Sequence, residues 1–228
     1  MVSAGKVFRL RENLELSTIA AKLNDFRREE NFDEESLHTR LLTEIHDLAL
    51  RRDRVEGIYS EDKVLYVFHR GERIPVPRTM EVHFAFVKRN ETMLLIVMER
   101  KLVANNIAGR LSEALFVTSG YITEVKIPPK VLRSFHEKNP DNTKVIFFDD
   151  VDLPNISKLS LYGSELLNTS LYNDYCSRGN IWYIVMTSKK SGNIVGITRN
   201  GVVTIFNNID KSGYLNYVIN EVFPLIQP

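Results

Sequence analysis

The chain has 228 residues, of which 43% are hydrophobic and 26% are charged, so it can build one or two folded domains and wholesale disorder is excluded. Its 30 basic and 29 acidic residues nearly cancel, and a net charge of +1 gives no general attraction to nucleic acid or to an anionic membrane. One cysteine excludes an internal disulfide framework and a Cys-based zinc site. No membrane association is expected, and the start of the chain lacks a signal peptide's apolar core, which favours an intracellular location, cytoplasmic or nuclear/nucleoid.

The first 54 residues are expected to form an N-terminal helical segment. Apolar residues recur at helical spacing from Leu14 to Phe26, and after a charged stretch Asp33 is a candidate N-cap for a second helix over 36–50. This second helix has the clearest 3.6-residue stripe in the chain. The stripe consists of Leu37, Leu41, Leu42, Ile45, Leu48 and Ala49.

From Val55 the apolar period changes to that of β-strands. The runs 55–60 and 64–69 predict two strands around a polar turn at Glu61-Asp62. The segment 73–78 contains Pro75 and Pro77, which do not suit a central strand, so it is expected to be a rigid connection.

A central hairpin is expected next. Residues 81–87 and 93–100 are apolar on both faces, as in strands that are covered on both sides. The turn between them contains Arg89-Asn90, and a helix is expected from Asn105 to Phe116.

The second half of the chain is expected to alternate short strands and helices. Asn200-Gly201 between two apolar runs is its strongest hairpin signal. Strands are expected over 121–127, 145–148, 159–162, 181–187, 194–198 and 202–206, and helices over 131–136, 166–175 and 215–222.

These elements predict an α+β protein with largely antiparallel sheets backed by helices. The expected organisation is an N-terminal helical segment (1–54), a first α+β unit (55–127), a connecting segment (128–162) and a second α+β unit (163–228).

The two α+β units share an order of features. A strand, a turn containing Arg-Asn, a second strand and a helix occur over 82–116 and again over 194–223, each after an expected helix (36–50 and 164–175). The order suggests an internal duplication.

A duplicated layout of this kind resembles the saddle of the TATA-box-binding-protein-like folds. The resemblance covers 55–116 and 164–226. It implies two similar curved antiparallel sheets backed by helices, with a concave face that meets DNA. The family's paired wedge phenylalanines are not recognisable, so the resemblance does not imply that this chain kinks the minor groove.

Glu81, Glu99 and Lys101 form the sharpest enzymatic pattern. If the hairpin centres on Asn90, Glu81 lies opposite Glu99, and Lys101 points to the same face. A carboxylate opposite Glu-x-Lys resembles the site of the PD-(D/E)xK nuclease fold. The resemblance implies that Glu81 and Glu99 hold Mg²⁺ while Lys101 positions the attacking water. The first acid is Glu rather than the usual Asp, which departs from the family pattern.

Other patterns point to binding rather than to chemistry. The expected turns carry basic residues in both α+β units, which suggests a surface that contacts phosphates. These residues are Lys88, Arg89, Lys189, Lys190 and Arg199. The alternative is that they are ordinary soluble loop tips.

Apart from the Mg²⁺ of the nuclease alternative, no cofactor is expected. Neither Gly-x-Gly-x-x-Gly nor a phosphate-loop pattern is present, and the acids Asp149, Asp150 and Asp152 are typical of turn-formers and caps, with a hard cation as the alternative.

The leading hypothesis is therefore a non-enzymatic binding protein that acts on nucleic acid or as an assembly scaffold. Its partners would be DNA or RNA, another protein, or a second copy of the chain. The alternatives are a Mg²⁺-dependent nuclease and a pure protein-protein interaction module.

Overall fold

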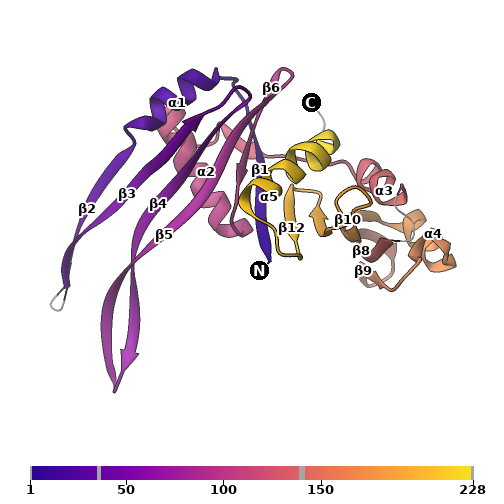
Figure 1. Ribbon diagram of the computed structural model, residues 1–228. Coiled ribbons are helices and arrows are strands. Elements are labelled where there is room, and N and C mark those ends of the chain that lie inside the picture. The colour runs from indigo at the N-terminus through magenta and orange to yellow at the C-terminus, as the bar shows by residue number, and fades with distance from the viewer. Residues whose placement is uncertain (1, 35–36, 139–141, 227–228) are drawn as a thin grey trace. The chain divides into compact units, whose positions relative to one another are not determined.

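The computed structural model describes residues 2–34, 37–138 and 142–226, which belong to two compact units (Figure 1). One, called here the ribbon unit, contains residues 9–98 and 103–123; the other, the C-terminal unit, contains residues 1–8, 99–102 and 124–228. The predicted segments 1–54 and 55–127 therefore fall largely within one unit, while 128–162 and 163–228 share the other.

The ribbon unit is a helix-backed antiparallel sheet, as the sequence led us to expect. Its strands follow one another in space in the order β2-β3-β4-β5-β6, and every neighbouring pair is antiparallel. The strands are β2 (Arg27–Glu34), β3 (Leu37–Leu50), β4 (Arg54–His69), β5 (Glu72–Arg89) and β6 (Thr92–Val97). Two helices, α1 (Leu16–Asn24) and α2 (Lys101–Phe116), pack behind them (Figure 1).

The core of the ribbon unit lies between the sheet and these helices. Cross-strand pairs put Val55 beside Phe86, Gly57 beside Phe84 and Tyr59 beside Val82. All the apolar members are buried. Gly57 is required by close approach, because a Cβ there would lie 2.9 Å from the Phe84 ring.

The expected helix over 36–50 is wrong, because this segment is the strand β3. The same sequence contains an alternating row, namely Leu37, Thr39, Leu41, Thr43 and Ile45, that fits a strand as well as the helical stripe fits a helix. Pairing on both sides, with β2 and with β4, decides between the two patterns. A bulge between His46 and Ala49, where Asp47 has a φ of 50°, then moves Leu48 back toward the core.

The predicted turn at Glu61-Asp62 and the predicted connection over 73–78 are also wrong. β4 runs through the first and β5 through the second, and the two strands pair without a break from Arg54↔Val87 to His69↔Glu72. The two-residue turn at Arg70-Gly71 makes His69↔Glu72 a hydrogen-bonded pair, so Pro75 and Pro77 fall at the alternate ladder sites, whose backbone nitrogen points away from β4. No ladder hydrogen bond to β4 is lost there.

The C-terminal unit is also antiparallel and backed by helices. Its strand order is β1-β12-β11-β10-β8-β9. The chain begins with the strand β1 (Ser3–Leu10), not with the expected helical segment. The other strands of this unit are β8 (Thr143–Leu153), β9 (Ile156–Tyr162), β10 (Asn180–Thr187), β11 (Ile194–Thr198) and β12 (Val202–Ile205), and its helices are α3 (Pro129–Glu137), α4 (Ser170–Arg178) and α5 (Lys211–Tyr217). The short strand β7 (Ile122–Glu124), at the boundary of the two units, pairs with β1.

A hairpin followed by a helix occurs in both units, as β5-β6-α2 and as β11-β12-α5. The hairpin predicted at Asn200-Gly201 is confirmed, with Gly201 at a φ of 75°. The segment before the first hairpin is a strand rather than a helix, so the two stretches differ there. Superposition of 80–117 on 193–224 stays a prediction.

No helix in the part of the chain that the structure describes is long and apolar enough to cross a membrane.

Candidate docking surface

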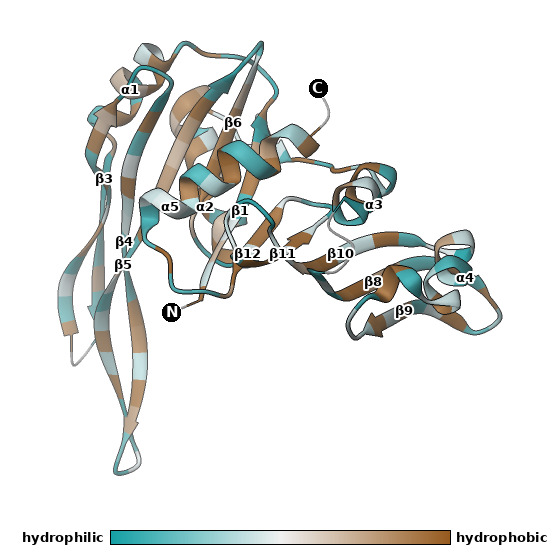
Figure 2. Ribbon diagram, turned by 45° about the vertical axis from the view of Figure 1, so that its right-hand side comes forward, coloured by the Kyte–Doolittle hydropathy of each residue, from teal (hydrophilic) through white to brown (hydrophobic). Residues whose placement is uncertain are grey.

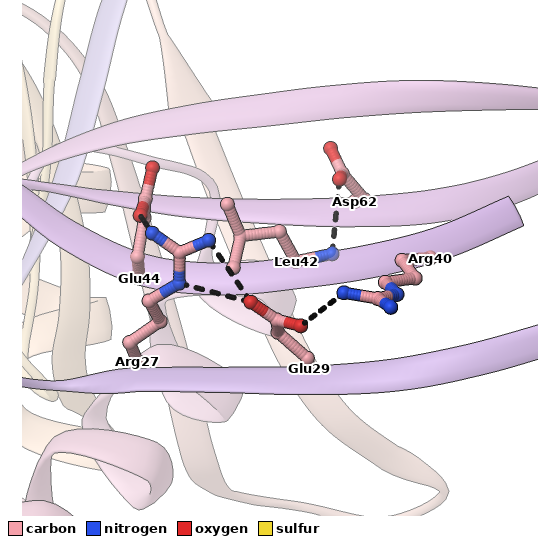
Figure 3. A network of polar contacts seen from close by, with 6 residues as sticks. All are labelled: Arg27, Glu29, Arg40, Leu42, Glu44 and Asp62. Carbon is pink, nitrogen blue, oxygen red and sulfur yellow. Dashed lines mark hydrogen bonds and ion pairs between the residues drawn. The ribbon is translucent and has the colours of Figure 1, made fainter.

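The distal halves of β4 and β5 form a two-stranded ribbon, called here the arm (residues 63–78). The pairing of β3 with β4 ends at Thr43↔Glu61. One residue further on, the Asp62 carboxylate accepts hydrogen bonds from the Leu42 backbone N–H (3.0 Å) and from the Thr79 hydroxyl (2.6 Å). Asp62 thus accepts the hydrogen bond of the Leu42 N–H at the point where β3 and β4 separate (Figure 3). Beyond it, among the described residues, β4 pairs only with β5.

Near Asp62, basic and acidic side chains of the neighbouring β2-β3 ribbon form ion pairs with one another. Glu29 accepts hydrogen bonds from Arg27 (2.9 Å to Nη2) and from Arg40 (3.4 Å to Nη1), and Arg27 also lies 3.8 Å from Glu44 (Figure 3). These pairs are exposed, so each adds little to stability.

The tip of the arm is a tight two-residue turn. Arg70 and Gly71 both have positive φ, at 50° and 87°, which is the geometry of a type I′ turn. This turn matches the right-handed twist of the two strands and fixes their register.

One face of the arm, called here the open face, presents aliphatic side chains to solvent. Leu65 pairs with Val76, and Val67 pairs with Ile74, so all four side chains lie on the same side of the ribbon. They are 43%, 40%, 50% and 38% exposed, respectively. Hydrophobic residues continue along β4 and β5 into the arm (Figure 2).

Charged pairs border these aliphatic rows. On the same side of the ribbon, Lys63 pairs with Arg78 at the base, and His69 pairs with Glu72 at the tip. Lys63 is engaged by Glu61 at 2.8 Å. Within the described residues, neither Arg78 nor Glu72 has an ion pair.

The opposite face of the arm is partly covered by its own side chains. The Arg73 guanidinium lies 3.5 Å from the centre of the Tyr66 ring, and the Tyr66 hydroxyl donates a hydrogen bond to Glu34 of β2. That hydrogen bond raises the pKa of Tyr66. Pro75 is buried beneath this arrangement, whereas Phe68 is 76% exposed.

Helix α2 covers the sheet only as far as the base of the arm. A cavity of about 450 Å³ lies between α2 and strands β4 and β5, and Lys63 is the most distal β4 residue that lines it. The buried Tyr59 hydroxyl, also in its wall, has no hydrogen-bond partner among the described residues. Burial raises the pKa of Tyr59 to about 12, so this group is a neutral phenol.

The structure does not bring Glu81, Glu99 and Lys101 together in the hairpin as predicted. β5 pairs with β6 through Phe84↔Val97, and β6 ends there. Glu99 lies past the strand end and accepts a hydrogen bond from the Arg100 backbone N–H (2.8 Å), while Lys101 begins α2. Glu81 is exposed and lies 3.7 Å from His46 Nε2. The expected register is therefore wrong, and the hairpin gives the nuclease alternative no geometric basis.

Three of the five predicted phosphate-contacting residues already have acidic partners. Lys88 is bound to Glu15 (3.0 Å) and Lys190 to Glu221 (3.0 Å), while Arg199 forms an ion pair with Asp149. Lys88 and Arg89 are the last two residues of β5, directly before the β5-β6 turn, and Lys189 lies in the β10-β11 turn. Each is placed at a turn, as predicted, but pairing removes much of the positive charge available to a phosphate.

The Asp149-Asp150-Asp152 run lies in β8, not after it. Within the described ranges, no group of three or more His, Cys, Asp and Glu side chains could hold a metal ion.

The C-terminal unit contains a buried polar cluster that no sequence pattern had predicted. Tyr172 donates its hydroxyl proton to Glu137 (2.7 Å), and its oxygen lies 2.8 Å from His136 Nε2. That nitrogen must then carry a proton, and His136 Nδ1 faces the Thr143 hydroxyl at 3.3 Å. Arg133 binds Glu137 at 2.7 Å.

Electrostatics keep this cluster in one protonation state. Burial lowers the pKa of His136 to about 4 and raises the pKa of Tyr172 and of the Cys176 thiol. The cluster thus holds a neutral imidazole, a phenol and a thiol at neutral pH. With its polar atoms paired, it ties α3 to α4 and β8.

Neither a protein-family profile nor a curated protein sequence matches this chain.

The sequence did contain a signal for the arm. Leu65, Val67, Ile74 and Val76 alternate with other residues on either side of a glycine turn, which is the pattern of a hairpin with one apolar face. The two prolines obscured it.

Proposed function

We propose that this protein is a non-enzymatic binding protein that joins an assembly by docking the open face of its β4-β5 arm on a macromolecular partner. The observation that supports the proposal is a set of four aliphatic side chains in two adjacent cross-strand pairs, Leu65–Val76 and Val67–Ile74. No helix of the described part of the chain covers this ribbon.

Two physical arguments support a docking role. An isolated two-stranded ribbon is only marginally stable in water, so covering one face of the arm would stabilise it. Each Å² of apolar surface removed from water contributes about 25 cal/mol. Single exposed hydrophobic residues need no explanation, but a contiguous set marks an interaction site.

Charge favours nucleic acid as a second candidate partner. Over residues 63–78 the arm carries Lys63, Arg70, Arg73 and Arg78 against Glu72, a net charge of +3. Paired strands can enter a groove of DNA, and apolar side chains can wedge between base steps. This candidate predicts salt-dependent binding that weakens when Arg70 and Arg73 are replaced by alanine.

Site-specific photocrosslinking tests the docking role. A benzophenone amino acid at Val67 on the open face should crosslink a partner in cells that express the protein, because the side chain is half exposed and faces away from its own ribbon. The same probe at Arg52, an exposed residue of the β3-β4 turn, is the matched control.

The crosslinked product identifies the class of partner. A product at Val67 and none at Arg52 supports docking, and digestion with nuclease or protease separates the two candidates. An absence of any product specific to Val67 would overturn the proposed function.

A further inference from the structure

We propose that the occupant of the open face is the same face of a second copy of this chain, turned end for end about a twofold axis. The inference rests on the docking role proposed above and specifies the partner. It follows from the order of the cross-strand pairs along the arm.

The open face carries four rows of paired side chains. From base to tip they are Lys63–Arg78, Leu65–Val76, Val67–Ile74 and His69–Glu72. Adjacent rows are two residues apart, which is about 6.8 Å along a strand. When a second arm is placed face to face in the opposite direction, the two aliphatic rows of one copy meet the two aliphatic rows of the other. Base rows then meet tip rows.

The charges on the outer rows favour the antiparallel arrangement of the two arms. With the arms antiparallel, Glu72 of each copy comes opposite Arg78 of the other, and twofold symmetry makes the pair twice. With the arms parallel about a twofold axis, β4 of one copy would face β5 of the other, so Arg78 would face Lys63, which like-charge repulsion disfavours, and Glu72 would not meet Arg78. Neither residue has an ion pair among the described residues, so both are available.

The pair cannot form within one chain. Arg78 and Glu72 are six residues apart on the same strand β5, which is about 20 Å in an extended conformation. Any charge dependence between these two positions therefore reports a contact between two copies.

The opposite face of the arm does not offer the same match. Arg73 and Tyr66 stack there, and Glu34 binds the Tyr66 hydroxyl, so those polar groups already have partners. The open face is the side of the ribbon that has both apolar area and unpaired complementary charge.

Sedimentation equilibrium of the full chain at low salt tests the inference with a charge-reversal cycle. The wild type should dimerise in the micromolar range. Arg78→Glu and Glu72→Arg should each raise the dimer dissociation constant by at least about tenfold, a loss of two ion pairs and their replacement by repulsion. The double variant Glu72→Arg/Arg78→Glu should return to within about threefold of the wild type, because the pair is restored with reversed sign.

Two further variants complete the test. Val67→Asp places a carboxylate in the aliphatic rows and should raise the dimer dissociation constant by at least about a hundredfold, so that the protein is mainly monomeric at about 10 μM. Arg52→Glu makes the same change in net charge as Arg78→Glu, but in the β3-β4 turn, and should leave dimerisation unchanged. Circular dichroism and urea unfolding of each variant check that the fold is retained.

The outcomes separate the inference from the function on which it rests. A monomeric wild type at about 100 μM, a dimer unaffected by Val67→Asp, or a double variant no better than the single ones would each overturn the antiparallel pairing. If the chain is monomeric and Val67 still crosslinks a different molecule in cells, the docking role stands and only the identity of the partner is wrong. If Val67 crosslinks nothing, both fail.

Discussion

The two halves of the β4-β5 ladder have the same register and the same alternation, yet they meet opposite surroundings. In the proximal half, Tyr59, Val82 and Phe84 are at most 2% exposed beneath α1 and α2. In the arm, the aliphatic rows are 38–50% exposed. The difference shows that alternation in a strand predicts which side chains share a face, but not whether anything covers that face.

The largest expected effect on stability comes from creating a cavity in the covered, proximal half of the β4-β5 ladder. Phe84→Ala should lower the free energy of unfolding by about 3–5 kcal/mol, because it removes a buried ring and leaves a cavity. Ile74→Ala on the arm should change it by less than about 0.5 kcal/mol in monomeric protein. Urea unfolding at low protein concentration measures both. Equal losses would mean that the arm is covered in the monomer, contrary to the structure.

Acid should destabilise the fold at the buried His136 of the C-terminal unit, a site that has no counterpart in the arm. The pKa of His136 falls from 6.5 to about 4 on folding, so the folded protein resists protonation that the unfolded chain accepts. The free energy of unfolding should therefore be constant above pH 6.5 and fall by about 3 kcal/mol between pH 6.5 and 4, at 1.36 kcal/mol per unit. Chemical unfolding at a series of pH values measures this loss.

The side chains that face His136 should not reverse this trend. Glu137 raises the pKa of His136 and Arg133 lowers it, and both effects are smaller than that of burial. His136→Gln should flatten the pH dependence in this range, while His69→Gln at the exposed tip of the arm should leave it unchanged. A slope that survives His136→Gln would assign it to another group.

Side chains in the covered, proximal half pack so closely that one added methyl group should destabilise the fold. Gly57→Ala would bring a Cβ to 2.9 Å from the Phe84 ring and from a Leu48 methyl, and should cost about 1–3 kcal/mol. Gly109→Ala in α2, where a Cβ meets nothing within 4 Å, should instead stabilise by up to about 1 kcal/mol. Thermal unfolding of the two variants should shift in opposite directions. A shift in the same direction would contradict the packing described for Gly57.

The smallest expected effect lies at the boundary between the halves. Asp62→Ala removes the acceptor of the Leu42 N–H and the Thr79 hydroxyl, and should cost about 1 kcal/mol because the site is partly solvated. Amide hydrogen exchange should accelerate at Leu42 and not at Ile45, whose N–H binds the Phe26 carbonyl. Unchanged exchange at Leu42 would show that Asp62 does not hold the base of the arm.

Sequence patterns predicted the elements that depend on local chemistry. The Asn200-Gly201 hairpin and the helix near Val131–His136 follow from turn and helix signals alone. The strand β3 does not, since its residues satisfy both a helical and an alternating pattern and only its neighbours decide.

The candidate site shows the same limit. Its four aliphatic residues alternate visibly in the sequence, but Pro75 and Pro77 were incompatible with a central strand. They are compatible with β5 only because its outer edge is open along the arm, and which edge is open depends on residues far away in the chain. Exposure of the open face also depends on where α2 lies, which no local pattern specifies.

The two prolines also limit how the protein can self-associate. Uncontrolled β-aggregation grows by adding strands to an open edge, where each new strand needs outward N–H donors. At Pro75 and Pro77 the outward sites of β5 have no such donor. The arm can thus offer an apolar face for docking while its β5 edge resists the edge-to-edge growth that leads to fibrils.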